Sequence, residues 1–298
     1  MRREAEVPSE VAVPAHESLL ARTRRRFLRH RLAVLGSAVL LAIAVAALIG
    51  PFVLTDPNFT DLRAVQKPPS PAHPLGTDQS GRDVLARLVS GARTSLMVGF
   101  GAVAVYVTIG TFVGLVAGYF GGAADMILMR ATDTVLSIPT LLMTIIFVSV
   151  VGPSLVSVIS VIGLLGWPQV ARIVRSQILT LREAEFVTAA RVVGVGSRGI
   201  LARHLLPNTA GPLIVLATFG VANSILLEAG LSFLGLGVQS PDTSLGIMVN
   251  EARSPAVLNL VPWLWIPAGT LIALTVLAAN FIGDGLRDAL DPRSERTG

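Results

Sequence analysis

The segment TLREAEFVTAARVVGVGSRGILARHLLPN, residues 180–208, is polar and lies between long apolar stretches. Residues 134–171 form a region of 38 consecutive residues without a charge. A short basic connection joins this region to residue 180. Arginine exceeds glutamate within residues 180–208, the charged residues being Arg182, Arg191, Arg198 and Arg203 against Glu183 and Glu185. A basic segment beside apolar spans is typical of the cytoplasmic face of a membrane protein. We refer to residues 180–208 as the polar segment.

The polar segment also carries signals of regular structure. Thr180 and Glu183 have the spacing of a capping box, which predicts a helix start at this point. Val187, Ala190 and Gly194 follow at the spacing of one helix face. Glycines 194 and 196 predict the end of that helix, because glycine adopts the left-handed backbone conformation readily. The sequence therefore predicts a short helix, a glycine turn and a second short helix that ends near residue 207.

The composition excludes a soluble globular protein. Of the 298 residues, 52% are hydrophobic and 14% are charged, and the mean hydropathy is +0.68, which indicates an integral membrane protein. The absence of cysteine excludes disulfides and thiolate metal sites. Lys67 is the only lysine and no phosphate-binding P-loop is present, so ATP would have to bind to another chain. The net charge of +5 could suggest nucleic acid, but the arginines lie beside apolar spans, which favours a topological explanation.

The apolar stretches predict an all-α integral membrane protein with six transmembrane helices. The predicted spans are residues 32–54, 94–118, 134–152, 153–171, 212–236 and 262–282. The first could instead be a signal peptide, but its 23 uncharged residues are longer than a typical signal core of about 7–15 residues. Gly152-Pro153 divides the long apolar region into two spans. Gly110, Gly114 and Gly118 share one face of the second span and predict close helix packing.

The placement of basic residues predicts the orientation. With six spans both termini share one side, and that side holds 18 of the 24 lysines and arginines. The positive-inside rule therefore predicts cytoplasmic termini and a cytoplasmic polar segment. The predicted organisation is a cytoplasmic tail at 1–31, a first span with an extracytoplasmic segment at 32–93, a membrane core at 94–285 containing a cytoplasmic loop at 172–208, and a cytoplasmic tail at 286–298.

The extracytoplasmic segment carries a second polar cluster. Val84, Leu85, Leu88 and Val89 form an apolar stripe that predicts a helix lying on the membrane surface. Four polar side chains precede or interrupt this stripe and could suggest a metal or acid–base site: His73, Asp78, Arg82 and Asp83. No second cluster of ligands accompanies them, so we interpret them as structural.

Two polar residues interrupt the predicted fifth span. Asn223 and Glu228 lie within an otherwise apolar stretch. An ionisable group inside a span is a candidate for a functional site, here on a translocation path. The alternative is a carboxylate that is hydrogen-bonded between helices for assembly.

The polar segment resembles the EAA loop of importer-type ABC transporter permeases. The resemblance is carried by Ala189-Ala190, Gly194 after three further residues, and Leu206-Pro207. The wording FVTAARVVGVG and RHLLPN is most similar to the C-type permease of dipeptide and oligopeptide systems, as are LLEAGLSFLGLGV and the C-terminal GDGLRDALDPR. Thr188 replaces the usual glutamate of the motif, and His204 replaces an isoleucine. The family fold is the type I importer permease.

The resemblance implies that this loop docks on a cytoplasmic ATPase. The residues that it assigns to ATPase coupling are Glu185, Phe186, Thr188, Ala189, Ala190, Arg191, Gly194, Ser197, Arg203, His204, Leu206 and Pro207. It further implies a bacterial inner-membrane location and four kinds of contact: a second homologous permease, two ABC ATPases, an extracytoplasmic substrate-binding protein and the lipid bilayer. No enzyme activity, cofactor or nucleic acid is expected in this chain, since ATP and Mg²⁺ would be held by the ATPases.

Two alternatives remain open. A permease that imports nickel or glutathione would share most of these motifs. A stand-alone channel or secondary transporter would place several ionisable groups at mid-membrane, whereas this chain offers only Glu228. Residues 194–199 match the dinucleotide-binding pattern GxGxxG, but the strand that should precede it and the βαβ context are missing.

Overall fold

A computed structural model describes residues 19–239 and 241–290, and within these ranges the chain is helical with no strand. The predicted cytoplasmic tails at 1–31 and 286–298 lie partly at residues 1–18 and 291–298, outside the described residues. The α-helices are α1 (Leu19–Arg29), α2 (Arg31–Val53), α3 (Val84–Phe120), α4 (Gly122–Leu136), α5 (Thr140–Val151), α6 (Leu155–Leu181), α7 (Glu185–Val192), α8 (Ser197–Gly199), α9 (Leu206–Phe233), α10 (Leu245–Glu251), α11 (Pro255–Leu260) and α12 (Ile266–Leu290). Short 3₁₀ turns occupy Leu62–Ala64 and Pro262–Leu264, and a π-helical turn occupies Ile200–Leu205.

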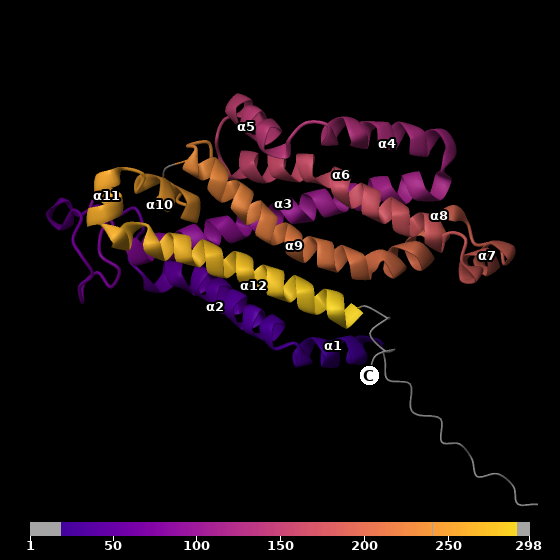
Figure 1. Cartoon of the computed structure of the whole chain (residues 1–298), viewed down its shortest axis with the longest axis horizontal. Coiled ribbons are helices and arrows are strands. Elements are labelled where there is room, and N and C mark those ends of the chain that lie inside the picture. The colour runs from indigo at the N-terminus through magenta and orange to yellow at the C-terminus, as the bar shows by residue number, and fades with distance from the viewer. Residues whose placement is uncertain (1–18, 240, 291–298) are drawn as a thin grey trace, which may run out of the picture.

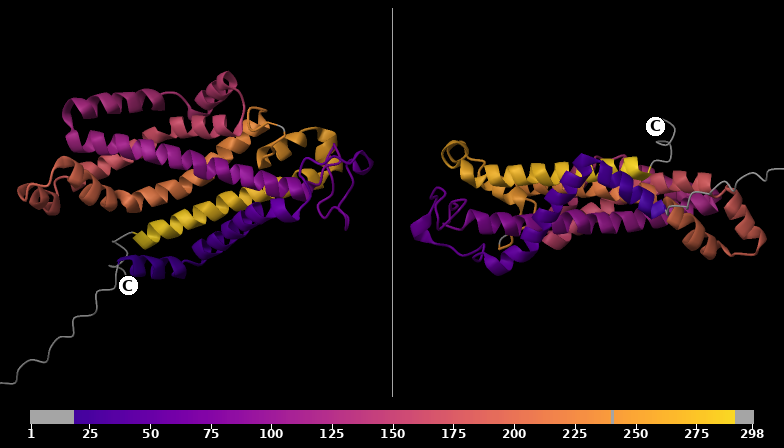
Figure 2. Two further views of the ribbon diagram at one scale, coloured as in Figure 1. Left: turned by 180° about the vertical axis from the view of Figure 1, so that it is seen from behind. Right: turned by 90° about the horizontal axis from the view of Figure 1, so that it is seen from below.

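The long helices α2, α3, α6, α9 and α12 lie roughly along one common axis and form an elongated bundle (Figures 1 and 2). The short helices α10 and α11 lie at one end of this bundle and α7 at the other, with α1 and the C-terminal end of α12 toward the α7 end (Figure 1). Five helical stretches are long and apolar enough to cross a membrane, and the count is six if the bent pair α4 and α5 is one span. The predicted all-α membrane fold is confirmed.

The predicted third span, residues 134–152, is wrong as a single straight helix. The chain instead forms α4 and α5, which are bent by 84° relative to each other at a short break. Pro139 stands at this break as the N-cap of α5, and it disfavours helical backbone at the residue before it. The predicted division at Gly152 is confirmed, since its φ of +96° separates α5 from α6.

The predicted helix on the membrane surface is also wrong. Val84 is the first residue of α3, so the stripe belongs to the start of a 37-residue helix. The Asp83 carboxylate caps this helix by accepting a hydrogen bond from the Ala86 amide. Val84 is fully buried in an apolar cluster with Met248 and Leu264. The stripe is therefore the packed start of α3, with Val84 buried and Leu85, Leu88 and Val89 half-buried, and not a separate surface helix.

Two other span boundaries differ from the prediction. The apolar stripe after Gly196 does not end near residue 207 as a separate helix, because Ser197–Phe233 forms one helical stretch through the π-helical turn. The helical stretch that contains the predicted span at 212–236 thus begins 15 residues before it. Pro207 lies inside this stretch, directly after the π-helical turn at Ile200–Leu205, and does not end it. The last helix extends to Leu290 and not to residue 282.

The centre of the bundle is the contact between α3 and α6. At Gly114, an added Cβ would lie 2.6 Å from the carbonyl oxygen of Ala171 and 2.6 Å from Val174 Cβ. Gly110 and Gly118 face α6 in the same way, with Val170 and Ile178 as neighbours. The predicted packing face is therefore confirmed, because these glycines allow the two backbones to approach closely.

We expect Gly114→Ala to destabilise the protein, because the new methyl group would collide with the backbone of α6. Overpacking of this kind costs about 1–3 kcal/mol. A matched control is Gly230→Ala in α9, where no atom lies within 4 Å of the added methyl group and alanine is the better helix former. Thermal unfolding of the detergent-purified variants should give a lower midpoint for the first and no decrease for the second; equal midpoints would contradict the packing role.

Candidate functional site

The polar segment lies at the end of the bundle that also holds α1 and the C-terminal end of α12 (Figure 1). The capping box predicted at Thr180 and Glu183 is wrong, because α6 continues to Leu181 and the Thr180 hydroxyl donates to the carbonyl of Ser176. The short helix is α7, whose N-cap is Ala184 and has no side-chain cap. The apolar packing of Ile178, which is fully buried, continues α6 beyond the predicted start.

The end of α7 is a Schellman motif centred on Gly194. The amide of Gly194 donates to the carbonyl of Arg191 at 3.0 Å, and the amide of Val195 donates to the carbonyl of Ala190 at 3.0 Å. Gly194 has a φ of +87°, so the predicted left-handed glycine is confirmed at this position. Gly196 has a φ of −67° and lacks this conformation, so that part of the prediction is wrong.

One side of α7 is buried and fixes its position. Val187 is fully buried and Ala190 is 9% exposed, and both belong to the apolar cluster that contains Ile178, Ile200 and Leu205. These three residues come from α6 and the π-helical turn. A movement of α7 would therefore act on the helices on both sides of the polar segment, because packed interiors transmit displacement.

The other side of α7 is exposed. Of the twelve residues assigned by resemblance to ATPase coupling, Ala190 is buried and His204 is half-buried, and the structure exposes Glu185, Phe186, Thr188, Ala189, Arg191, Gly194, Ser197, Arg203, Leu206 and Pro207. Val192 and Val193 are 82% and 83% exposed and were not predicted. The sequence could have indicated this exposure, because neither valine falls on the i, i+3, i+7 spacing of Val187, Ala190 and Gly194. The exposed side thus combines small, apolar and basic groups.

Polar contacts attach the polar segment to the end of α3. The Arg182 guanidinium donates to the carbonyl of Gly118 at 3.0 Å and lies 3.0 Å from the Glu183 carboxylate. The Arg191 guanidinium lies 5.8 Å from the centre of the Tyr119 ring, within the range of a cation–π contact. Both partners stand in the last turn of α3, so the end of α6 and α7 are each held to α3.

Asn223 lines an open cavity of about 320 Å³ between α3, α6 and α9. Gln169 from α6 lines the same cavity and was not singled out from the sequence. Gln169 could have been found from the sequence, because it is a polar residue next to Pro168 inside an apolar span. Residues on both sides of the break between α4 and α5, Leu136 and Thr140, complete one wall. The cavity lining contains no charged side chain.

Glu228 is fully buried at a different place, between α3 and α9. Its carboxylate accepts hydrogen bonds from the Ser95 hydroxyl at 2.8 Å and the Ser232 hydroxyl at 2.6 Å. Ser244, which caps α10, lies within hydrogen-bond distance of Ser232 at 3.2 Å. Glu228 does not line the cavity beside Asn223. These contacts support the interpretation of Glu228 as a helix-packing residue.

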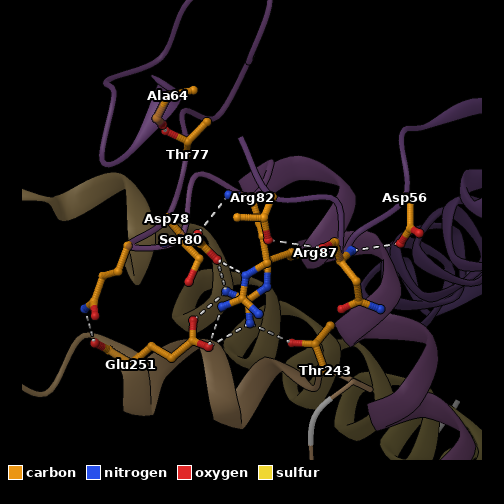
Figure 3. A network of polar contacts seen from close by, with 12 residues as sticks. Asp56, Ala64, Thr77, Asp78, Ser80, Arg82, Arg87, Thr243 and Glu251 are labelled. Atoms are coloured by element: carbon orange, nitrogen blue, oxygen red, sulfur yellow. Dashed lines mark hydrogen bonds and ion pairs between the residues drawn. The ribbon is translucent and has the colours of Figure 1, made fainter. Parts of the chain in front are cut away.

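A charged cluster at the opposite end of the bundle was only partly predicted (Figure 3). The Arg87 side chain is 3% exposed and lies between Asp78 and Glu251, pairing with Glu251 through both terminal nitrogens. Arg82 contacts both of these carboxylates as well. Thr243 accepts a further bond from Arg87 at 3.3 Å. The cluster joins the connection between α2 and α3 to α3 and α10, as a structural interpretation of Asp78 and Arg82 requires.

His73 and Asp83 form a separate contact, in which His73 Nδ1 lies 2.9 Å from an Asp83 carboxylate oxygen. Between residues 19 and 290, leaving out residue 240, no group of three or more histidine, aspartate or glutamate side chains is arranged to hold a metal ion. Arg87 and Glu251 were missed because they lie 164 residues apart in the sequence.

Comparison with known proteins identifies the family. The family of binding-protein-dependent transport system inner membrane components matches residues 110–296, and the N-terminal transmembrane domain of oligopeptide transport permease C matches residues 18–69. The chain belongs to the first family. It is a permease component of ABC transporters and not the component that hydrolyses ATP. Permeases of this family work with ATPase and substrate-binding partners.

Three relatives cover most of the permease. A protein of Brucella suis that is named as a peptide permease is 46% identical over 95% of this chain and 94% of its own length. The dipeptide transport system permease protein of Alkalihalophilus pseudofirmus is 40% identical over 89% of this chain and 87% of its own. The oligopeptide transport system permease protein of Haemophilus influenzae is 41% identical over 93% of this chain and 89% of its own length.

We expect Glu228→Gln to leave the stability and the transport activity of the permease nearly unchanged. A glutamine keeps the shape of the side chain and can still bond to both serine hydroxyls. Glu228→Leu should destabilise the permease by about 1–3 kcal/mol, because Ser95 and Ser232 lose their buried partner. Thermal unfolding and reconstituted uptake would check both variants. A loss of uptake in the glutamine variant at normal stability would instead place the carboxylate on the translocation path.

Proposed function

We propose that this permease is the translocation subunit of an ATP-driven importer of dipeptides or oligopeptides. The support is the family of the chain together with the names of its relatives, which are peptide, dipeptide and oligopeptide permeases. The single structural observation that carries the coupling role is α7, a short helix with one buried and one exposed side at the end of the bundle. ATP and Mg²⁺ would be bound by partner subunits.

The assembly we propose has a second homologous permease, two ABC ATPases and an extracytoplasmic binding protein, in a bacterial inner membrane. The end that holds α7 would face the cytoplasm, because the basic residues concentrate in the polar segment and the tails. The helices α1 and α12 contribute their tail-side ends to the same end of the bundle, which supports cytoplasmic termini (Figure 1). The loop at 172–208 would then be the ATPase-coupling loop.

Coupling would proceed through the two sides of α7. The exposed residues between Glu185 and Val193 would dock on an ATPase. When the ATPases bind ATP and close, they would displace α7. The buried side, Val187 and Ala190, would pass this displacement to α6 and to the π-helical turn that leads into α9, whose residues share its apolar cluster. Rigid-body movements of packed helices are a common route of such transitions. The bundle would thereby alternate between states open to either side.

The translocation path would include the cavity beside Asn223 and Gln169. Its two amide side chains can donate to and accept from a peptide backbone. Since the lining carries no charge, it would accept peptides whose side chains differ in charge. Selection among cargoes could then take place in the binding protein.

We expect Ala189→Arg to abolish ATPase association, because a large side chain would stand on the exposed side of α7 without disturbing the buried side. The matched control is Ala123→Arg, which places the same side chain on an exposed alanine at the start of α4. Co-purification of the ATPases should fall by about tenfold or more in the first variant only, a change of about 1.4 kcal/mol. Uptake should be lost with it. Equal association of both variants would contradict docking through α7, and uptake by the purified chain alone would indicate a stand-alone transporter.

We expect Asn223→Asp to impose a charge preference on transport. A carboxylate in the uncharged cavity would repel acidic peptides, while Asn223→Ser, a smaller uncharged residue, should not. Uptake of a peptide with an acidic side chain should fall several-fold relative to one with a basic side chain, at the same binding-protein concentration. The same ratio in both variants and the wild type would exclude Asn223 from the path.

A further inference from the structure

The first helix of the structure is strongly basic and carries an apolar side. Within residues 19–31 there are six arginines and no acidic residue: Arg22, Arg24, Arg25, Arg26, Arg29 and Arg31. Arg22, Arg24, Arg29 and Arg31 are exposed. A cluster of this size next to a transmembrane helix, on an amphipathic helix, is typical of segments that bind anionic lipids.

Specific contacts hold α1 against the end of α12, so its orientation is fixed. The ring of Phe27 lies against Gly285, where an added Cβ would come within 3.3 Å of it. His30 joins α1 to α2: its Nδ1 accepts a hydrogen bond from the Ala33 amide at 3.1 Å, and its Nε2 lies 3.6 Å from the Asp288 carboxylate. The chain turns sharply between the two helices (Figure 2, right).

Exposed leucines show the depth at which α1 lies. Leu28, Leu32 and Leu35 are 56%, 49% and 56% exposed and continue the exposed apolar surface of α2 up to α1. Such a surface is stable in the hydrocarbon of a bilayer. Arg29 and Arg31 lie between Leu28 and Leu32 and the other arginines lie beyond them, which would place the guanidinium groups at the level of the lipid headgroups.

Among the residues that the structure describes, the carboxylates beside α1 are fewer than its exposed arginines. The end of α12 presents two exposed carboxylates, Asp284 and Asp288, together with Arg287, and His30 already lies beside Asp288. The exposed arginines of α1 therefore retain an excess of positive charge. A guanidinium binds a phosphate diester through paired hydrogen bonds as well as by charge.

We propose that α1 and the first residue of α2 form a binding surface for the phosphate headgroups of anionic phospholipids, in the leaflet on the side of α7. This surface would hold α1, and through Phe27 and His30 the end of α12, at a fixed depth in the bilayer. The inference does not depend on the transported cargo or on which residues dock the ATPase.

The test uses the full-length permease in lipid vesicles. Because the chain has no cysteine, a single fluorophore can be attached at Leu28→Cys beside the arginines. Quenching by phosphatidylglycerol labelled with a nitroxide near the headgroup is compared with quenching by phosphatidylcholine labelled identically, at equal mole fractions. We expect phosphatidylglycerol to quench more strongly, since each basic residue near an anionic surface gives a preference of about fivefold.

The variant R22Q/R24Q/R29Q removes three exposed arginines of this surface and should lower the quenching ratio several-fold. The matched control R63Q/K67Q/R253Q removes three exposed cations from the other end of the bundle and should leave the ratio unchanged. The charge-preserving variant R22K/R24K/R29K should keep most of the preference and shows that the fold tolerates substitution here. Raising the salt concentration to about 1 M, where the screening length is about 3 Å, should weaken the preference of the wild type.

Three results would overturn the proposal. A ratio of one in the wild type would show that the arginines do not select anionic lipid, and an unchanged ratio in the glutamine variant would place the selectivity elsewhere. Displacement by inorganic phosphate beyond that caused by sodium chloride of equal ionic strength would identify free phosphate as the ligand. If the glutamine variant kept the ratio but lost co-purified ATPase, the basic surface would belong to the protein interface.

Discussion

The close approach of α3 and α6 is the contact on which the rest of this structure depends. In a bilayer, the hydrophobic effect contributes little to helix association. Close packing between helix backbones has to supply the association energy instead. The glycines at 110, 114 and 118 allow this contact along the second half of α3. The last of them faces Ile178, only three residues before the end of α6. The contact therefore continues to the point where the polar segment begins.

The position of α7 follows from that contact. Arg182 reaches the carbonyl of Gly118, and Arg191 lies over the neighbouring Tyr119 ring. Val187 and Ala190 fill the space between α6 and the π-helical turn that leads into α9. A single apolar cluster thus joins α7 to the helices whose faces line the cavity at Asn223. A force applied to the exposed side of α7 has a continuous packed route to that cavity, as the proposed coupling requires.

The sequence was sufficient for the fold class, for the glycine face of α3 and for the left-handed turn at Gly194, because each depends on local composition or spacing. It was insufficient where distant residues decide. The stripe at Val84 was predicted to face a membrane surface, since nothing local reveals that Met248 and Leu264 cover it. The capping box at Thr180 matched the pattern, but tertiary packing of Ile178 extends α6 past it. The Arg87 cluster likewise joins residues from three separate segments.

The break between α4 and α5 connects this helical geometry with the proposed path. α5 begins after Pro139 with no side-chain cap, so the amide groups of its first turn have no partner within the helix. Such groups are tolerated at membrane depth only where they face protein or a water-filled space. Leu136 and Thr140 flank the break and both line the cavity that contains Asn223 and Gln169. A lipid-facing break would leave these amides without partners at a cost of several kcal/mol each, so a position against protein or beside the proposed path is favoured.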